Sequence, residues 1–141
     1  MNDPLIPQDF LYALTQAAHN FGAMAVTGGA VLARWPVQQA DAVRRRMAWW
    51  VLVGWMLQAL TGATMGVINL AFYGHFPDIH GIALAALLLK IGCAVLGFVL
   101  TVLYLKASPT WPLARQLAVW NALIVLAATA LTAAAFLRWF A

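Results

Sequence analysis

The chain has 141 residues, of which 65% are hydrophobic and 9% are charged, and its mean hydropathy is +0.85. A soluble domain has about 25% charged residues, so this composition is typical of an integral membrane protein and leaves little chain for a soluble domain. The net charge of +4 does not indicate nucleic-acid binding, because the basic residues lie near the ends of apolar segments, where membrane topology accounts for them. The single cysteine, Cys93, excludes an internal disulfide.

Four apolar segments are each long enough to cross a hydrocarbon core of about 30 Å as a helix that rises about 1.5 Å per residue. The first follows Pro7 and Asp9 and ends before Trp35 and Pro36, which are start and stop signals for a helix. Together the four cover residues 10–33, 47–72, 79–105 and 113–137. Because the connections are short, we expect an all-α fold: one transmembrane domain that forms an integral membrane four-helix bundle.

The basic residues predict how these segments are oriented. Six of them lie in or beside the first and third connections, namely Arg34, Arg44, Arg45, Arg46, Lys106 and Arg115. The second connection, "YGHFPDIHG", has no lysine or arginine. Arg138, near the C-terminus, is the single basic residue that favours the opposite orientation. The positive-inside rule therefore predicts a bacterial-type inner (cytoplasmic) membrane protein with both termini on the outer, periplasmic side.

Polar residues on the faces of the segments predict a site inside the bundle. In the third segment, helical spacing places Lys90 with the small residues Ala83, Ala86, Cys93, Ala94 and Gly97, opposite Leu84, Leu88, Ile91, Val95, Phe98 and Val102. Small residues mark helix contacts in membranes, so we expect Lys90 to face the bundle. His19 and Lys90 each lie about 14–15 Å from the outer ends of their segments, and Gln58 and Thr61 come to a similar depth. In the fourth segment, Asn121 lies on an alanine-rich side with Ala114, Ala118 and Ala128.

Lys90 makes insertion of this segment into the membrane less favourable, because a lysine at a helix centre raises the free energy of insertion by about 2.5–3.5 kcal/mol. The sequence has no glutamate, and its four aspartates lie outside the predicted spans. Lys90 therefore has no carboxylate partner at its own depth. Three alternatives follow: Lys90 is neutral, it bonds Gln58 or a backbone carbonyl, or its partner is a group the chain does not encode, such as a bound anion, a cofactor carboxylate or another subunit.

The histidines are candidate metal ligands. His19 is a candidate ligand for haem iron or copper, since neutral imidazole is the commonest metal ligand. The alternative is a hydrogen bond to Gln58 or Asn121 that joins helices. His75 and His80 flank "FPDI" and would form a metal site with Met65 or Asp78, although a pair of interfacial histidines is the simpler interpretation.

Several stretches resemble the CopD/HemJ-like four-helix membrane proteins. The stretch "HNFGAMAVTGG" resembles their first helix, "LQALTGATMG" their second, "YGHFPDIHGIALAALLLKIGCAVLG" their loop and third helix, and "ARQLAVWNALIVLAATAL" their last helix. The resemblance implies a haem or metal ligand at His19 and a site residue at Lys90. It implies either a b-type haem and protoporphyrinogen oxidase-like activity, or copper handling.

Three functions follow as expectations. The first is a redox protein that binds haem b through His19, with Gln58 or Asn121 orienting the ring and Lys90 holding a quinone or a carboxylate such as that of a porphyrin. It would be an oxidoreductase or an electron-transfer subunit of a respiratory complex. The second is a copper-handling protein that uses His19, Met65, His75 and His80. The third is a cofactor-free accessory subunit that packs against other membrane subunits or against copies of itself.

Overall fold

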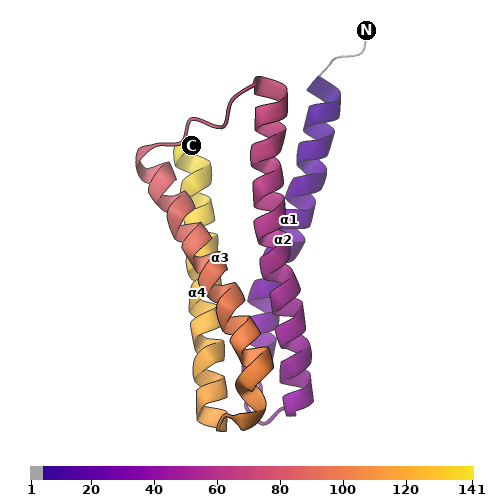
Figure 1. Ribbon diagram of the computed structural model, residues 1–141, viewed down its shortest axis with the longest axis vertical. Coiled ribbons are helices and arrows are strands. Elements are labelled where there is room, and N and C mark those ends of the chain that lie inside the picture. Colours follow the sequence, from indigo (N-terminus) through magenta and orange to yellow (C-terminus); the bar gives the residue numbers. More distant parts are fainter. Residues whose placement is uncertain (1–4) are drawn as a thin grey trace.

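The computed structural model describes the backbone of residues 5–141 and the side chains of residues 7–141, and the regular elements of this part of the chain are all helices joined by short connections. Its elements are α1 (Leu5–Arg34), α2 (Asp41–Tyr73), α3 (Gly81–Ala107), the short 3-10 helix η1 (Ser108–Thr110) and α4 (Leu113–Phe140). Figure 1 shows the long helices side by side, with the start of α1 and the end of α4 at the same end of the molecule. The predicted all-α fold is therefore confirmed.

Two helix starts differ clearly from the prediction, because α1 begins at Leu5 and not at residue 10, and α2 also begins early. The second helix begins at Asp41 and not at Met47, so Arg44, Arg45 and Arg46 belong to its first turns and not to a loop. A carboxylate in the first turn interacts favourably with the positive end of the helix dipole. Asp41 occupies this position, and its carboxylate also pairs with Arg44.

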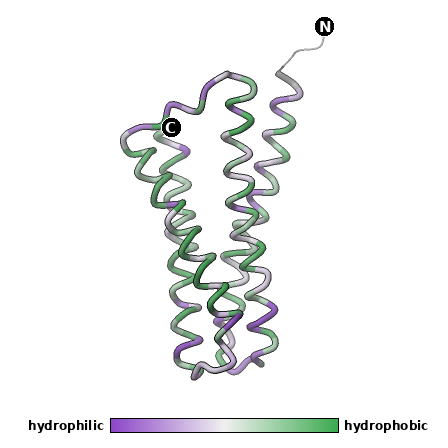
Figure 2. The backbone as a smooth tube through the Cα atoms, in the orientation of Figure 1, coloured by the Kyte–Doolittle hydropathy of each residue, from purple (hydrophilic) through white to green (hydrophobic). Residues whose placement is uncertain are grey.

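The helices have the length and hydropathy expected of a membrane protein. Three of them, α2, α3 continued through η1, and α4, are long and apolar enough to cross a membrane. Helix α1 has 30 residues but carries Gln16, His19 and Asn20 near its middle, and it is not among the three. Figure 2 shows apolar residues along the helices and hydrophilic ones gathered mainly at their ends and in the connection between α2 and α3. The crossing of the membrane by α1 stays a prediction.

The molecule is built from two helical hairpins. Helix α1 packs mainly on α2, and α3 packs mainly on α4, while α1–α4 and α2–α3 contacts join the two hairpins. The hairpins are close together at the end where α1 meets α2 and α3 meets α4, which we call the basic end because Arg34, Arg44, Arg45, Arg46, Lys106 and Arg115 lie there. They diverge toward the opposite end, where residues 74–80 connect α2 to α3 (Figure 1). We call this the loop end.

Two glycines allow backbones to approach closely. A Cβ atom on Gly54 of α2 would lie 2.8 Å from Cγ2 of Val26 on α1. A Cβ atom on Gly97 of α3 would overlap the indole ring of Trp55 on α2. Close approach at small residues is the usual basis of helix packing in membranes, so these contacts set how α1, α2 and α3 are rotated against one another.

The faces of α3 agree with the sequence prediction, whereas the predicted face of α4 is wrong. Ala83, Ala86, Cys93 and Gly97 are buried, and most of the bulky residues on the other side of α3 are exposed. In α4 the predicted inward residues, Asn121 with Ala114, Ala118 and Ala128, are all exposed. The buried face is instead Gln116, Trp120, Leu123, Ala127, Ala130 and Ala133. Trp120 decides the rotation of α4, because its ring is fully buried and packs edge-on against Tyr104, with 4.9 Å between ring centroids.

A buried polar network closes the basic end. The guanidinium of Arg44, only 2% exposed, pairs with Asp41 at 2.9 Å and donates to the backbone oxygen of Val37. In the other hairpin, the Tyr104 hydroxyl donates to Oε1 of Gln116 at 2.9 Å. These bonds fix the two connections at this end with groups supplied by the chain itself.

Candidate functional site

The structure brings together three polar side chains from three helices in the middle of the bundle. The ring of His19, on α1, has Nδ1 at 2.7 Å from Oγ1 of Thr61 on α2 and Nε2 at 3.0 Å from Nζ of Lys90 on α3. The result is one continuous hydrogen-bonded chain, Lys90–His19–Thr61, that crosses from one hairpin to the other. This chain of side chains lies far from both ends of the bundle.

The depth of this chain follows from the helix lengths. Between Gly81 and Lys90, α3 rises by about 14 Å, and between Lys90 and Ala107 by about 25 Å. Thr61 lies about 18 Å from the loop end of α2 and about 30 Å from its basic end. The three side chains are therefore well inside the hydrocarbon region if the helices cross the membrane along their length.

The hydrogen bonds of Thr61 fix the tautomer of His19. The hydroxyl of Thr61 donates its single proton to the backbone oxygen of Leu57 at 2.5 Å. Its oxygen must then accept from His19, so Nδ1 carries a proton. In a neutral imidazole the other nitrogen, Nε2, is an acceptor, and Lys90 donates to it. The donors of the chain thus all point from Lys90 toward α2.

Gln58 holds the helix backbone beneath the histidine. Its amide Nε2 donates to the backbone oxygen of His19 at 2.5 Å, which joins α1 to α2 one turn below Thr61. A residue that orients the ring would bond to one of its nitrogens, whereas Gln58 bonds to the backbone of His19. It fixes the height of His19 on α1 relative to α2, and Thr61 fixes the plane of the ring.

The site carries a cation without an acid. His19 is 8% exposed and Lys90 is partly buried. The described aspartates lie elsewhere: Asp9 in the first turns of α1, Asp41 at the start of α2 and Asp78 in the connection at the loop end. In residues 7–141 the ion pairs are Arg44 with Asp41 and His80 with Asp78, and neither involves Lys90. The prediction concerned the depth of the aspartates in the sequence, and none of those in residues 7–141 pairs with Lys90.

Asn121 does not belong to this site. Its Oδ1 accepts from Nε of Arg34 at 2.8 Å, at the basic end. The reason is its depth, because Asn121 lies only about 12 Å along α4 from Leu113. Asn121 therefore does not orient His19 in this structure.

The other predicted metal ligands are also apart from one another. His80 contacts Asp78, with 3.5 Å between Nδ1 and Oδ1, and Nδ1 of His75 lies 2.9 Å from the backbone oxygen of Phe76. Both histidines are exposed in the connection at the loop end, whereas Met65 lies on α2. Across the described residues, no group of three or more histidine, cysteine or acidic side chains is placed to hold a metal ion.

A haem held through His19 does not fit this arrangement. Iron needs a free ring nitrogen, but Nδ1 is bonded to Thr61 and Nε2 to Lys90. Coordination through Nε2 would require Lys90 to move away and lose its bond. The residues as they stand form a hydrogen-bonded site.

The contact between His19 and Lys90 was not predicted directly. The sequence placed both residues at one depth and on inward faces, and this was the available signal. What it could not show is that the two side chains meet each other, with Thr61 on the far side of the ring.

No family model, curated protein or solved structure matches this chain. The CopD/HemJ-like resemblance accordingly stays a prediction, and the function has to be inferred from the site.

Proposed function

We propose that this protein binds a lipid-soluble ligand inside the membrane through an acceptor oxygen that Lys90 recognises, and that Lys90 and His19 exchange protons there. The ligand is a quinone, which offers a carbonyl oxygen, or a molecule with a carboxylate, such as a porphyrin. One observation carries the proposal. Lys90 lies in the middle of a transmembrane helix, is only partly buried, and has a neutral imidazole as its partner where a cation needs an anion.

The chemistry of the amine supports binding of an acceptor. A lysine ammonium has three N–H donors, and one of them is directed at Nε2 of His19. The other donors have no acceptor among the described side chains. A carboxylate would satisfy them and neutralise the charge, and a quinone carbonyl would satisfy them without neutralising it.

The pairing of Lys90 with His19 supports proton exchange. With 3.0 Å between Nζ and Nε2, a proton can reside on either nitrogen without a change in heavy-atom positions. The pair thus holds one proton as ammonium with imidazole or as amine with imidazolium. Thr61, which accepts from Nδ1 in both states, keeps the ring aligned while the proton moves.

The orientation and the setting complete the proposal. With the basic end in the cytoplasm, as the positive-inside rule requires, the loop end and both chain ends face the outer side of an inner (cytoplasmic) membrane. In this setting the protein serves as a ligand-binding subunit or enzyme of a membrane electron-transfer system, and it associates with further subunits or with copies of itself.

Ligand titration of the purified protein tests the proposal. Decylubiquinone and, separately, the dicarboxylate mesoporphyrin are titrated while the quenching of tryptophan fluorescence is recorded. We expect at least one of them to bind, and Lys90→Met to weaken its binding about tenfold or more, because a charge-assisted hydrogen bond is lost. Lys106→Met, which removes an exposed lysine at the basic end of the same helix, should leave the affinity unchanged. The proposal fails if neither probe binds or if Lys90→Met binds as the unmodified chain does.

The same preparation also tests the haem alternative. A b-type band in the reduced-minus-oxidised absorbance spectrum that disappears in His19→Ala would show that Nε2 of His19 binds haem iron and no longer bonds to Lys90. Given that both ring nitrogens have side-chain partners, we expect no such His19-dependent band.

A further inference from the structure

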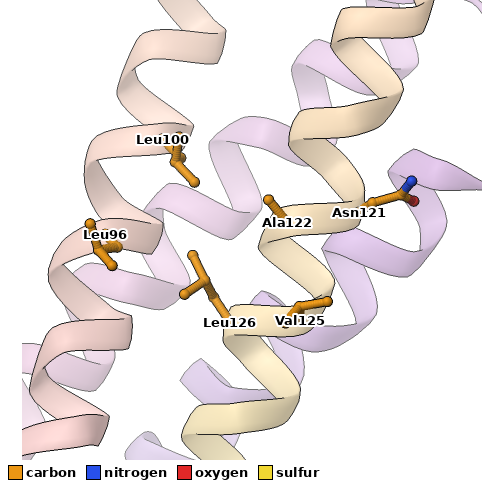
Figure 3. Close-up of a pocket in the computed structure, with 6 residues that line it drawn as sticks. All are labelled: Leu96, Leu100, Asn121, Ala122, Val125 and Leu126. Carbon is orange, nitrogen blue, oxygen red and sulfur yellow. The ribbon is translucent and has the colours of Figure 1, made fainter.

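An apolar groove runs along the seam between α3 and α4, on the outside of the bundle. Its lower part has a volume of about 450 Å³ and is lined by Leu96, Leu100, Asn121, Ala122, Val125 and Leu126. Figure 3 shows Leu96 and Leu100 on α3 facing Ala122 and Leu126 on α4, with Asn121 at the edge, directed away from them. A second hollow of about 450 Å³ lies along the same two helices, between Leu89 on α3 and Thr129 on α4.

Helical spacing indicates that the two hollows belong to one groove. On α3, Leu89, Leu96 and Leu100 follow one another at intervals of seven and four residues, so they share a face. On α4, Ala122, Thr129 and Ala133 have the same intervals. The groove therefore continues along most of the hairpin, and alanines on α4 leave it unfilled.

A cation lies in line with the groove at the basic end. Arg115 precedes Ala122 by seven residues and is therefore on the same face of α4. Its guanidinium lies over the ring of Trp111, 4.4 Å from the ring centroid, and is exposed. In the part of the chain that the structure describes, Arg115 forms no ion pair.

A second guanidinium, that of Arg34, lies beside the groove. Arg34 donates through Nε to Asn121, which borders the groove, while its Nη1 is buried and has no hydrogen-bond partner among the described residues. Asp41, the acid that the described residues place at this end, is already paired with Arg44. Within residues 7–141, Arg115 and Arg34 thus have no anionic partner.

From this geometry we infer that the α3–α4 groove binds an anionic phospholipid, with an acyl chain between Leu96 and Ala122 and the phosphate at Arg115. An anionic phospholipid matches this site in both shape and charge. The groove lies at the depth of the acyl chains, whereas Arg115 and Trp111 lie at the end of α4 where headgroups are found. A neutral lipid or a second protein helix would fill the groove but leave the two guanidinium groups without an anion. This site is separate from the Lys90–His19–Thr61 chain and does not depend on the function proposed for it.

Native mass spectrometry of the detergent-purified chain tests this inference, with phosphatidylglycerol and phosphatidylcholine added in turn. We expect a bound phosphatidylglycerol to be retained about fivefold to tenfold more strongly than phosphatidylcholine, given the contribution of a basic residue near an anionic headgroup. Arg115→Gln should abolish this preference. Arg46→Gln, which removes an exposed arginine at the same end but on α2, should preserve it.

A second variant tests the groove itself. Ala122→Phe fills it from an exposed position, so it should release the lipid while the chain stays folded, as judged by circular dichroism. Inorganic phosphate in excess should not displace the lipid, since the acyl chain contributes to binding. Equal retention of the two lipids, an unchanged preference in Arg115→Gln, or a lipid-independent dimer cross-linked through Ala122→Cys would overturn the inference.

Discussion

The two buried polar clusters of this molecule differ in whether the chain supplies a partner for the cation. At the basic end, Arg44 has the carboxylate of Asp41 and the backbone oxygen of Val37, which lies in a connection and is free to accept. In the middle of the bundle, Lys90 has only the imidazole of His19. The described aspartates lie at helix ends or in a connection, away from the depth of Lys90. We therefore expect the first cluster to stabilise the fold, whereas the second is the site that we propose binds an acceptor.

Replacing Arg44 should have the largest effect on stability. Arg44→Met removes a guanidinium that is 2% exposed and that bonds to two acceptors. We expect the free energy of unfolding to fall by about 3 kcal/mol, because hydrogen bonds to a charged group are each worth roughly 1.5–3 kcal/mol. The measurement is unfolding by sodium dodecyl sulfate in mixed micelles, followed by tryptophan fluorescence.

The matched control for this change is Arg46→Met. Arg46 is exposed on the same helix, so its replacement should stay within about 0.5 kcal/mol of the unmodified protein. If the two variants unfold alike, the network at the basic end does not stabilise the protein as we describe.

Replacing Lys90 should change stability in the opposite direction. Lys90→Met removes a cation whose placement at a helix centre costs about 2.5–3.5 kcal/mol and gives up one hydrogen bond to His19 worth about 1 kcal/mol. The expected net result in the same unfolding measurement is a gain of about 1.5–2.5 kcal/mol. A loss like that expected for Arg44→Met would mean that Lys90 is retained for structure, and the comparison between the two clusters would fail.

The smallest effect is expected at Thr61. Thr61→Val removes the oxygen that accepts from Nδ1 of His19 and should lower the free energy of unfolding by about 1 kcal/mol, the usual size of a hydrogen bond between helices in a membrane. Thr64→Val is the control, since the hydroxyl of Thr64 donates only to Leu60 of its own helix, at 2.9 Å. Equal unfolding midpoints for the two valine variants would show that the His19–Thr61 bond contributes nothing to stability.

The predictions succeeded for α3 and failed for α4 because the two helices differ in pattern. In α3, small residues and bulky residues occupy opposite sides, and the buried residues Ala83, Ala86, Cys93 and Gly97 follow the small side. In α4, alanine and leucine occur on every side, so the periodicity gives no direction. In α4 the rotation of the helix is set by the contact of the buried Trp120 with Tyr104 on α3. The sequence of α4 alone gives no sign of this contact, because it joins two helices.

The sequence by itself determined the helices, their apolar character, and the absence of an acid at the depth of Lys90, because each of these depends on residue type and on distance along one helix. It also placed His19 and Lys90 at one depth, since every residue adds a fixed rise. Only the tertiary structure decided that Lys90 meets His19, that Thr61 holds the other side of the ring, and that Asn121 pairs with Arg34. These pairings depend on how the helices are rotated and tilted against one another. That rotation is set by close contacts between helices, such as Gly54 with Val26 and Gly97 with Trp55.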